Sequence, residues 1–123
     1  MVRVLVLADD LIWATRLAGQ VRASGAEPAP VRGSAPFRDA LASADGAIVD
    51  LTSRAYDGLA EIGAAREAGV RVLAVGQHDD HDLRRQAIAA GADRVLAYRK
   101  LFDDGPATIA RWLSAPHPTE ATQ

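Results

Sequence analysis

The stretch from Val2 to Asp10, VRVLVLADD, decides the fold, because it is a continuous apolar run that ends in two acidic residues. A second run of this kind, GAIVD, ends at Asp50. Continuous runs of Val, Leu and Ile are typical of strands buried on both faces, as in parallel sheets covered by helices. Ligands of such sheets bind beyond the carboxyl ends of the strands. The sequence therefore predicts that the carboxylates of Asp9, Asp10 and Asp50 share one small, electronegative pocket.

Composition indicates a single domain. The 123 residues suffice for a core, which must be aliphatic because 49% of residues are hydrophobic and only 5% aromatic. A net charge of −2 without a basic cluster argues against direct nucleic-acid binding. No stretch has the pattern of a signal peptide or a membrane span, so a cytoplasmic protein without membrane contact is expected. The expected domain covers residues 1–114, followed by a disordered C-terminal tail, residues 115–123, which is polar and contains proline.

Strand and helix patterns alternate five times with short connections, which is typical of an α/β fold. The expected strands are Val2–Ala8, Glu27–Arg32, Gly46–Asp50, Val70–Val75 and Arg94–Tyr98. A helix is expected after each strand: one to about Ala23, one capped by Ser34, one from about Asp57, one capped by Asp79 or Asp80, and Pro106–Ser114.

The second strand indicates the order of the sheet. Pro28 and Pro30 lack an N–H group, and residues two apart in a strand direct their N–H positions to the same side. Both prolines can then face outward if this strand lies at an edge. The sequence thus predicts a flavodoxin-like, doubly wound, five-stranded parallel sheet of order 2-1-3-4-5 with helices on both faces. In that order the first and third strands are neighbours, which brings the three carboxylates together.

Three clustered carboxylates repel one another, so a cation or a reaction that uses them is the favoured explanation. The alternative is structural. Asp9 and Asp10 are suited to capping the first helix, where the helix dipole favours negative charge. Asp50 alone would more often begin a loop.

The order of these motifs resembles the receiver domain of response regulators, over Val2 to about Leu113. Receivers carry an acidic pair after the first strand, matched by Asp9-Asp10, and a phospho-accepting aspartate after the third, matched by Asp50. Further matches are Asp57-Gly58 and Ala90-Gly91-Ala92. The resemblance implies that Asp50 is the phospho-acceptor, that Asp10 binds Mg²⁺ directly and Asp9 largely through water, and that the backbone carbonyl of Thr52 completes the metal site.

The sequence also departs from the receiver pattern. Gly76 stands at the end of the fourth strand, where receivers usually have Ser or Thr. The strand-five lysine position falls on Tyr98, whereas Lys100 comes two residues later. Two residues preserve the side-chain face of a strand, so Lys100 is the candidate for the lysine role at Asp50 if a bulge or a longer strand brings it to the pocket. No aromatic residue occupies the usual switch position, and proline is missing after Asp50. The metal half of the site is thus present and the readout half altered.

Three functions remain open. The first is a stand-alone receiver-like protein of a two-component phosphorelay, with Mg²⁺ as cofactor and no enzymatic activity beyond its own phosphorylation. Its partners would be a histidine kinase or phosphotransfer protein and an unknown downstream protein, and a homodimer is allowed. The second is a pseudo-receiver, which binds proteins without being phosphorylated. The third is a small-ligand-binding flavodoxin-like domain, although the acids after the first strand repel phosphate.

Two further sequence features concern the surroundings of the pocket. Trp13 lies off the apolar stripe of the first helix, one turn from Asp10, and is expected at the rim of the pocket, whereas Trp112 is expected in the core. The segment from His78 to Asp82, HDDHD, has the residue types of a metal cluster. It lacks a helical i,i+4 pair of ligands, so a solvated helix start is the preferred interpretation.

Overall fold

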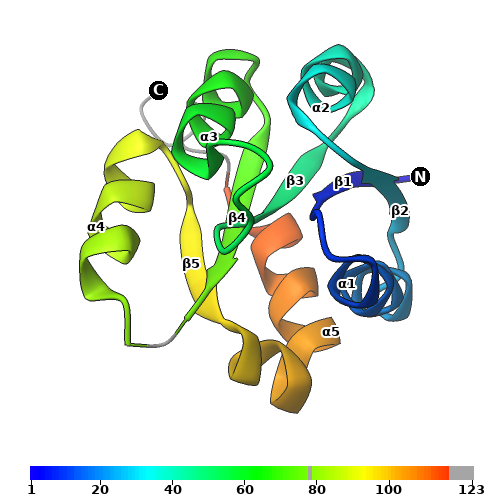
Figure 1. Ribbon diagram of the computed structural model, residues 1–123. Helices are drawn as coiled ribbons and strands as arrows, with labels where there is room; N and C mark the ends of the chain where they lie inside the picture. Colours follow the sequence, from blue (N-terminus) through cyan, green and yellow to red (C-terminus); the bar gives the residue numbers. More distant parts are fainter. Residues whose placement is uncertain (78, 117–123) are drawn as a thin grey trace.

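The computed structural model, which describes residues 1–77 and 79–116, contains one parallel sheet whose strand order is β2-β1-β3-β4-β5, as predicted (Figure 1). The strands are β1 (Arg3–Leu7), β2 (Glu27–Val31), β3 (Gly46–Asp50), β4 (Arg71–Gly76) and β5 (Arg94–Ala97). The helices are α1 (Leu11–Ala23), α2 (Ser34–Ala40), α3 (Gly58–Glu67), α4 (His81–Ala90) and α5 (Tyr98–Ser114), with a 3₁₀ turn, η1 (Leu41–Ser43), after α2. The predicted tail lies outside the described residues apart from Ala115 and Pro116.

The edge position of β2 is confirmed. This strand pairs only with β1, and the pairing places Pro28 opposite Val4 and Pro30 opposite Val6. The N–H of Glu27 donates to the carbonyl of Val2, at 2.8 Å, so the odd-numbered positions of β2 face β1. The two prolines therefore sit at the positions that face away from the sheet.

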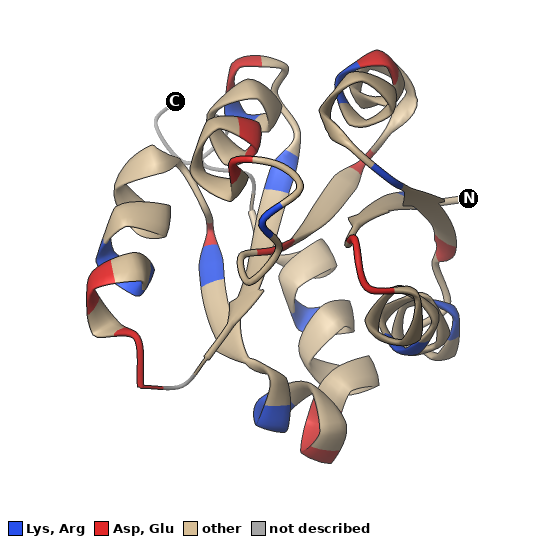
Figure 2. Ribbon diagram, in the orientation of Figure 1, with Lys and Arg blue, Asp and Glu red and all other residues tan. Residues whose placement is uncertain are grey.

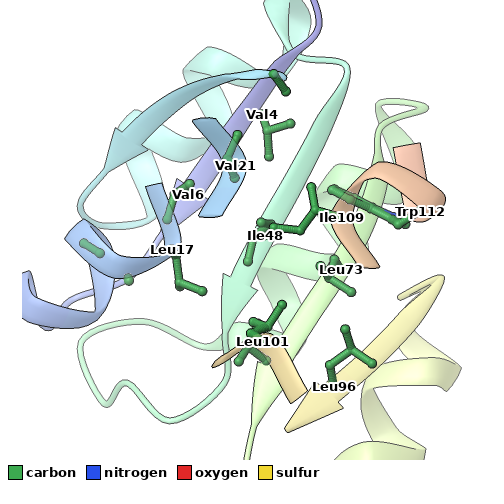
Figure 3. Packing of buried hydrophobic residues seen from close by; sticks show 14 residues of the cluster. Val4, Val6, Leu17, Val21, Ile48, Leu73, Leu96, Leu101, Ile109 and Trp112 are labelled. Atoms are coloured by element: carbon green, nitrogen blue, oxygen red, sulfur yellow. The ribbon is translucent and has the colours of Figure 1, made fainter. Parts of the chain in front are cut away.

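The two faces of the sheet are covered by different helices. Alternate residues of each strand point to opposite faces, and each set packs into its own apolar cluster. Helices α1 and α5 cover one face, where Ile48 and Leu73 of the sheet meet Leu17, Ile109 and Trp112 (Figure 3). Helices α2, α3 and α4 cover the other, with Phe37, Ile62 and Ala87. This double cover explains the continuous apolar runs of the strands.

The start of a helix agrees with the sequence-based expectation at three of the four aspartate or serine residues considered. Asp10, Asp57 and Asp80 are N-caps, and their carboxylates accept the backbone N–H groups of the first turns of α1, α3 and α4. The predicted cap at Ser34 is wrong. Its hydroxyl instead donates to the carboxylate of Glu61 on α3, at 2.8 and 2.9 Å to the two oxygens, and Gly33 precedes the helix.

The end of β5 differs from the prediction. The strand stops at Ala97, not at Tyr98, and the chain turns at once into α5. Helix α5 is kinked at Asp104, whose φ and ψ are −150° and 33°, so the segment from Pro106 resumes as a second helical piece. Proline is well tolerated at the first turn of such a piece. Within the described residues, no helix combines the length and apolar character needed to cross a membrane.

Candidate functional site

Asp50 lies at the carboxyl end of β3, in the middle of the sheet, and is only 1% exposed. Leu7 of β1 pairs with Val49, so the two residues that follow them, Ala8 and Asp50, are level. Asp9 and Asp10 then lead from β1 into α1. Figure 2 shows the acidic segment between β1 and α1 on the same side of the sheet as the acidic end of β3, where the strands have their carboxyl ends. The acids thus lie at the carboxyl ends of neighbouring strands, as the strand order predicted.

The carboxylate of Asp50 is held through one of its two oxygens. Its Oδ1 accepts the backbone N–H of Thr52 at 2.9 Å, the hydroxyl of Thr52 at 2.8 Å, and the hydroxyl of Tyr98. The hydroxyls of Thr52 and Tyr98 are themselves 2.8 Å apart. Oδ2 takes part in none of the hydrogen bonds among the described residues. It is therefore the oxygen that is open to another partner.

Tyr56, which the sequence did not single out, fastens the backbone of the site. Its hydroxyl lies 3.0 Å from the carbonyl oxygen of Leu7 and 2.5 Å from that of Asp50. The side chain thereby links the ends of β1 and β3. Burial is the main cause that raises the pKa of Tyr56, and the negative charge of Asp50 adds to it.

Asp9 and Asp10 already have other contacts in this structure. Asp10 Oδ1 accepts the N–H of Trp13 at 3.0 Å, so the capping role is realised. Asp9 is exposed, with its Oδ1 3.9 Å from an Nη of Arg32. In the described part of the chain no three His, Asp or Glu side chains are gathered closely enough to hold a metal ion. The cation site formed by the three acids thus stays a prediction. In this structure their side chains are not gathered as metal ligands.

The oxygen atoms of these side chains are nevertheless the type of ligand that a hard cation prefers. Asp10 and Asp50 each offer one carboxylate oxygen without a hydrogen bond among the described residues, and Mg²⁺ prefers one or two carboxylates completed by waters. Asp10 and Asp50 are therefore the residues that fit Mg²⁺, with the carbonyl of Thr52 implied by the resemblance. Asp9, turned toward Arg32, fits a contact through water.

The structure does not place Lys100 on an extended strand. The residue lies in α5, 48% exposed, with its Nζ 3.7 Å from a carboxylate oxygen of Asp104. The longer strand that would bring Lys100 to the pocket does not form, because the chain becomes helical at Tyr98. Tyr98 is the residue after β5 that reaches Asp50.

Gly76 ends β4, as predicted, and pairs with Ala97 of β5. A Cβ built on Gly76 would meet only carbons of Leu51, at 3.6 and 3.7 Å, which are ordinary contacts. Lack of space therefore does not explain why glycine stands here in place of the Ser or Thr that is usual in receivers.

We expect Gly76→Ala to raise the free energy of unfolding by about 0.4–1 kcal/mol, because the φ of Gly76 is not positive and alanine restricts the unfolded chain. Urea unfolding measures the change. Gly91→Ala is the matched control, since φ is 124° there and a Cβ would lie 2.4–3.2 Å from side-chain carbons of Arg66. This control should lose stability. A loss of stability in Gly76→Ala would contradict the expectation.

Trp13 lies at the rim of this site, as predicted. Its ring stacks on that of Tyr98 with centroids 3.9 Å apart, and the ring of Phe102 lies 5.5 Å away. Trp112 is 2% exposed in the core. Of the HDDHD segment, His78 lies outside the described residues, Asp80 caps α4 and Asp82 pairs with Arg85.

The two tyrosines of the chain should both titrate late. Burial is the largest cause that raises the pKa of Tyr98, and the hydrogen bond to Asp50 is the second. The pKa of Tyr56 is raised as well. We therefore expect no phenolate absorbance from the native protein near pH 10, the ordinary tyrosine pKa. The unfolded chain loses these protons there while the native state keeps them, so stability should fall as the pH rises above 10.

A spectrophotometric titration with circular dichroism in parallel checks this expectation. Tyr56→Phe and Tyr98→Phe should each remove one of the two delayed absorbance steps. A phenolate step centred near pH 10 in a chain that is still folded would contradict it.

With this geometry established, solved structures identify the fold. A response regulator from Thermotoga maritima is similar to this chain with a TM-score of 0.81 and 18% identity, over 94% of this chain and 99% of that one. The signal receiver domain of a DNA-binding response regulator from Colwellia psychrerythraea has a TM-score of 0.80 and 19% identity, over 94% and 100% of the two chains. The chain therefore has the fold of response-regulator receiver domains, and the predicted resemblance is confirmed at that level.

A third similar structure is a response regulator from Burkholderia pseudomallei, which contains a phosphorylated aspartic acid, a calcium ion and citrate. Its TM-score is 0.77 at 19% identity, and the match covers 99% of this chain and 72% of that one. No protein-family model and no curated protein matches this sequence.

Proposed function

We propose that this chain is a receiver-like signalling protein of a two-component system, in which Asp50 accepts a phosphoryl group with the help of Mg²⁺. One observation carries the proposal. Asp50 is a buried carboxylate at the end of the central strand, fixed through Oδ1, while Oδ2 has no hydrogen bond among the described residues. A histidine kinase or phosphotransfer protein would supply the phosphoryl group, and a downstream protein would bind the result.

The chemistry of the step requires little from the chain beyond orientation. Oδ2 of Asp50 attacks phosphorus, the bond from phosphorus to the leaving group breaks, and the leaving group departs with the electron pair. Thr52 and Tyr98 hold Oδ1 and leave Oδ2 without a hydrogen bond among the described residues. Bound Mg²⁺ would neutralise charge on the incoming phosphoryl oxygens, and Asp10 and Asp50 are the residues that would hold it.

Incubation with acetyl phosphate and Mg²⁺, followed by intact mass, tests the proposal. Acetate is then the leaving group, and we expect a mass gain of one phosphoryl group in the native chain. Asp50→Ala should show none, whereas Asp103→Ala, which removes an exposed carboxylate of α5, should behave as the native chain does. Chelation of Mg²⁺ should suppress the gain. An unmodified native chain, or a modified Asp50→Ala, would refute the assignment.

A specific observation favours a second candidate, the pseudo-receiver. The hydroxyl of Tyr98 contacts the oxygen of Asp50, Lys100 pairs with Asp104, and Gly76 offers no hydroxyl. A site with these contacts suits a protein-interaction module that needs no phosphorylation. The same mass measurement separates the two, because only the first candidate gains a phosphoryl group.

A further inference from the structure

Tyr98 joins two environments that the proposed function leaves unconnected. At its hydroxyl end it contacts Oδ1 of Asp50, and it lies 2.8 Å from the hydroxyl of Thr52. Along its ring it stacks on Trp13 of α1, with centroids 3.9 Å apart and planes inclined by 29°. A displacement of the hydroxyl therefore moves a ring that is packed against another helix.

The aromatic side of Tyr98 is a surface cluster, formed by Trp13, Arg16, Tyr98 and Phe102. The guanidinium of Arg16 lies 5.5 Å from the Trp13 ring centre and 5.2 Å from that of Phe102. Trp13 is partly buried and Phe102 is 53% exposed. Since these rings come from both α1 and α5, the cluster spans two helices on one face of the sheet.

The hydrogen bonds at Asp50 depend on the charge of its carboxylate. A bond that a hydroxyl donates to an ionised oxygen is roughly twice as strong as one to a neutral oxygen. When Oδ2 carries a phosphoryl group, Oδ1 becomes the uncharged carbonyl oxygen of an acyl phosphate, and the negative charge lies on the phosphoryl oxygens. The Tyr98 hydroxyl then has a better acceptor in a different place.

Few other side chains can respond to this change. Among the described residues, the carboxylate of Asp50 accepts hydrogen bonds from Thr52 and Tyr98 alone. Thr52 is two residues from Asp50 and exposed, and its side chain reaches beyond its own loop through the hydroxyl of Tyr98. Tyr98 is the one of the two that is packed against another element.

We propose that Tyr98 is a positioning residue that couples the charge of Asp50 to the packing of Trp13, so that modification of Asp50 rearranges the aromatic cluster between α1 and α5. In its phosphoryl-dependent form this coupling rests on the proposed function. Its core, the dependence of Trp13 on the Asp50 charge through the Tyr98 hydroxyl, can be tested without phosphorylation.

The test uses the tryptophan emission of the full chain, excited where tyrosine does not absorb. Asp50→Asn removes the charge and keeps the shape of the side chain. We expect Asp50→Asn to shift the emission of the native chain, and to lose that effect in a Tyr98→Phe background, which keeps the ring and removes the hydroxyl. Trp13→Phe should abolish the shift as well, because the remaining Trp112 is buried in the core.

The coupling is overturned if Asp50→Asn leaves the emission unchanged, or changes it equally with and without the Tyr98 hydroxyl. A second arm adds beryllium fluoride and Mg²⁺, as a phosphoryl mimic, to the native and Tyr98→Phe chains, with intact mass after acetyl phosphate as its companion. An emission response to Asp50→Asn in a chain that gains no mass would reject the proposed phosphorylation and keep the coupling. A mass gain without any Tyr98-dependent response would do the reverse.

Discussion

Trp112→Ala is expected to lower the free energy of unfolding by about 3–5 kcal/mol, which is the usual cost of truncating a buried tryptophan. Trp112 is 2% exposed and is packed directly on the start of β3, where a Cβ on Gly46 would lie 2.8 Å from the ring. The glycine thus makes the room that the indole fills, and alanine would leave a cavity between α5 and the sheet.

Urea unfolding of Trp112→Ala, followed by circular dichroism, measures this loss. Trp13→Ala is the matched control, because it removes the other tryptophan of the chain, which is only partly buried at the surface of α1. The control should cost clearly less. Equal losses in the two variants would show that the core around Trp112 is not packed as described.

Arg38→Met should also destabilise the protein strongly, because it removes the cation that pairs with the buried carboxylate of Glu61. Glu61 of α3 has a side chain only 3% exposed. It accepts hydrogen bonds from Nε of Arg38 at 3.0 Å and from Nη2 at 2.7 Å. These bonds, and the charge of Glu61, raise the pKa of Arg38. Without Arg38 the carboxylate stays buried, and the hydroxyl of Ser34 is its one remaining side-chain donor among the described residues. An uncompensated buried charge is costly.

Arg85→Met provides the comparison for this prediction. Arg85 pairs with Asp82 on the surface of α4, where the two side chains are 74% and 79% exposed, and such pairs contribute little. The double variant Arg38→Met/Glu61→Leu should recover stability relative to Arg38→Met, since it removes the stranded charge as well. Indistinguishable midpoints for Arg38→Met and Arg85→Met would contradict this account.

The fold could be predicted because its determinants are local or periodic. The apolar runs of β1 and β3 require a sheet covered on both faces, and the prolines of β2 require an edge. The caps at Asp10, Asp57 and Asp80 follow from the residue type and the start of an apolar helical pattern. Together these features fix the strand order and place the acids at the carboxyl ends of the strands.

The contacts of the candidate site could not be predicted in the same way. Tyr98 meets Asp50 across 48 positions of sequence, and Tyr56 meets Leu7 across 49. Such contacts depend on where β5 ends and how the following loop turns, which no short pattern encodes. Ser34 illustrates the same limit, because a distant buried carboxylate on α3 outcompetes the local helix N–H groups for its hydroxyl.

The outward prolines of β2 also bear on how copies of the chain can meet. An exposed sheet edge is a template for another strand, and joining two such edges is a common route to aggregation. Pro28 and Pro30 withhold the N–H donors that a neighbouring strand would need along this edge. Continuous sheets running from one molecule to the next are therefore disfavoured at β2, which leaves helix surfaces, or the opposite border at β5, for any self-association.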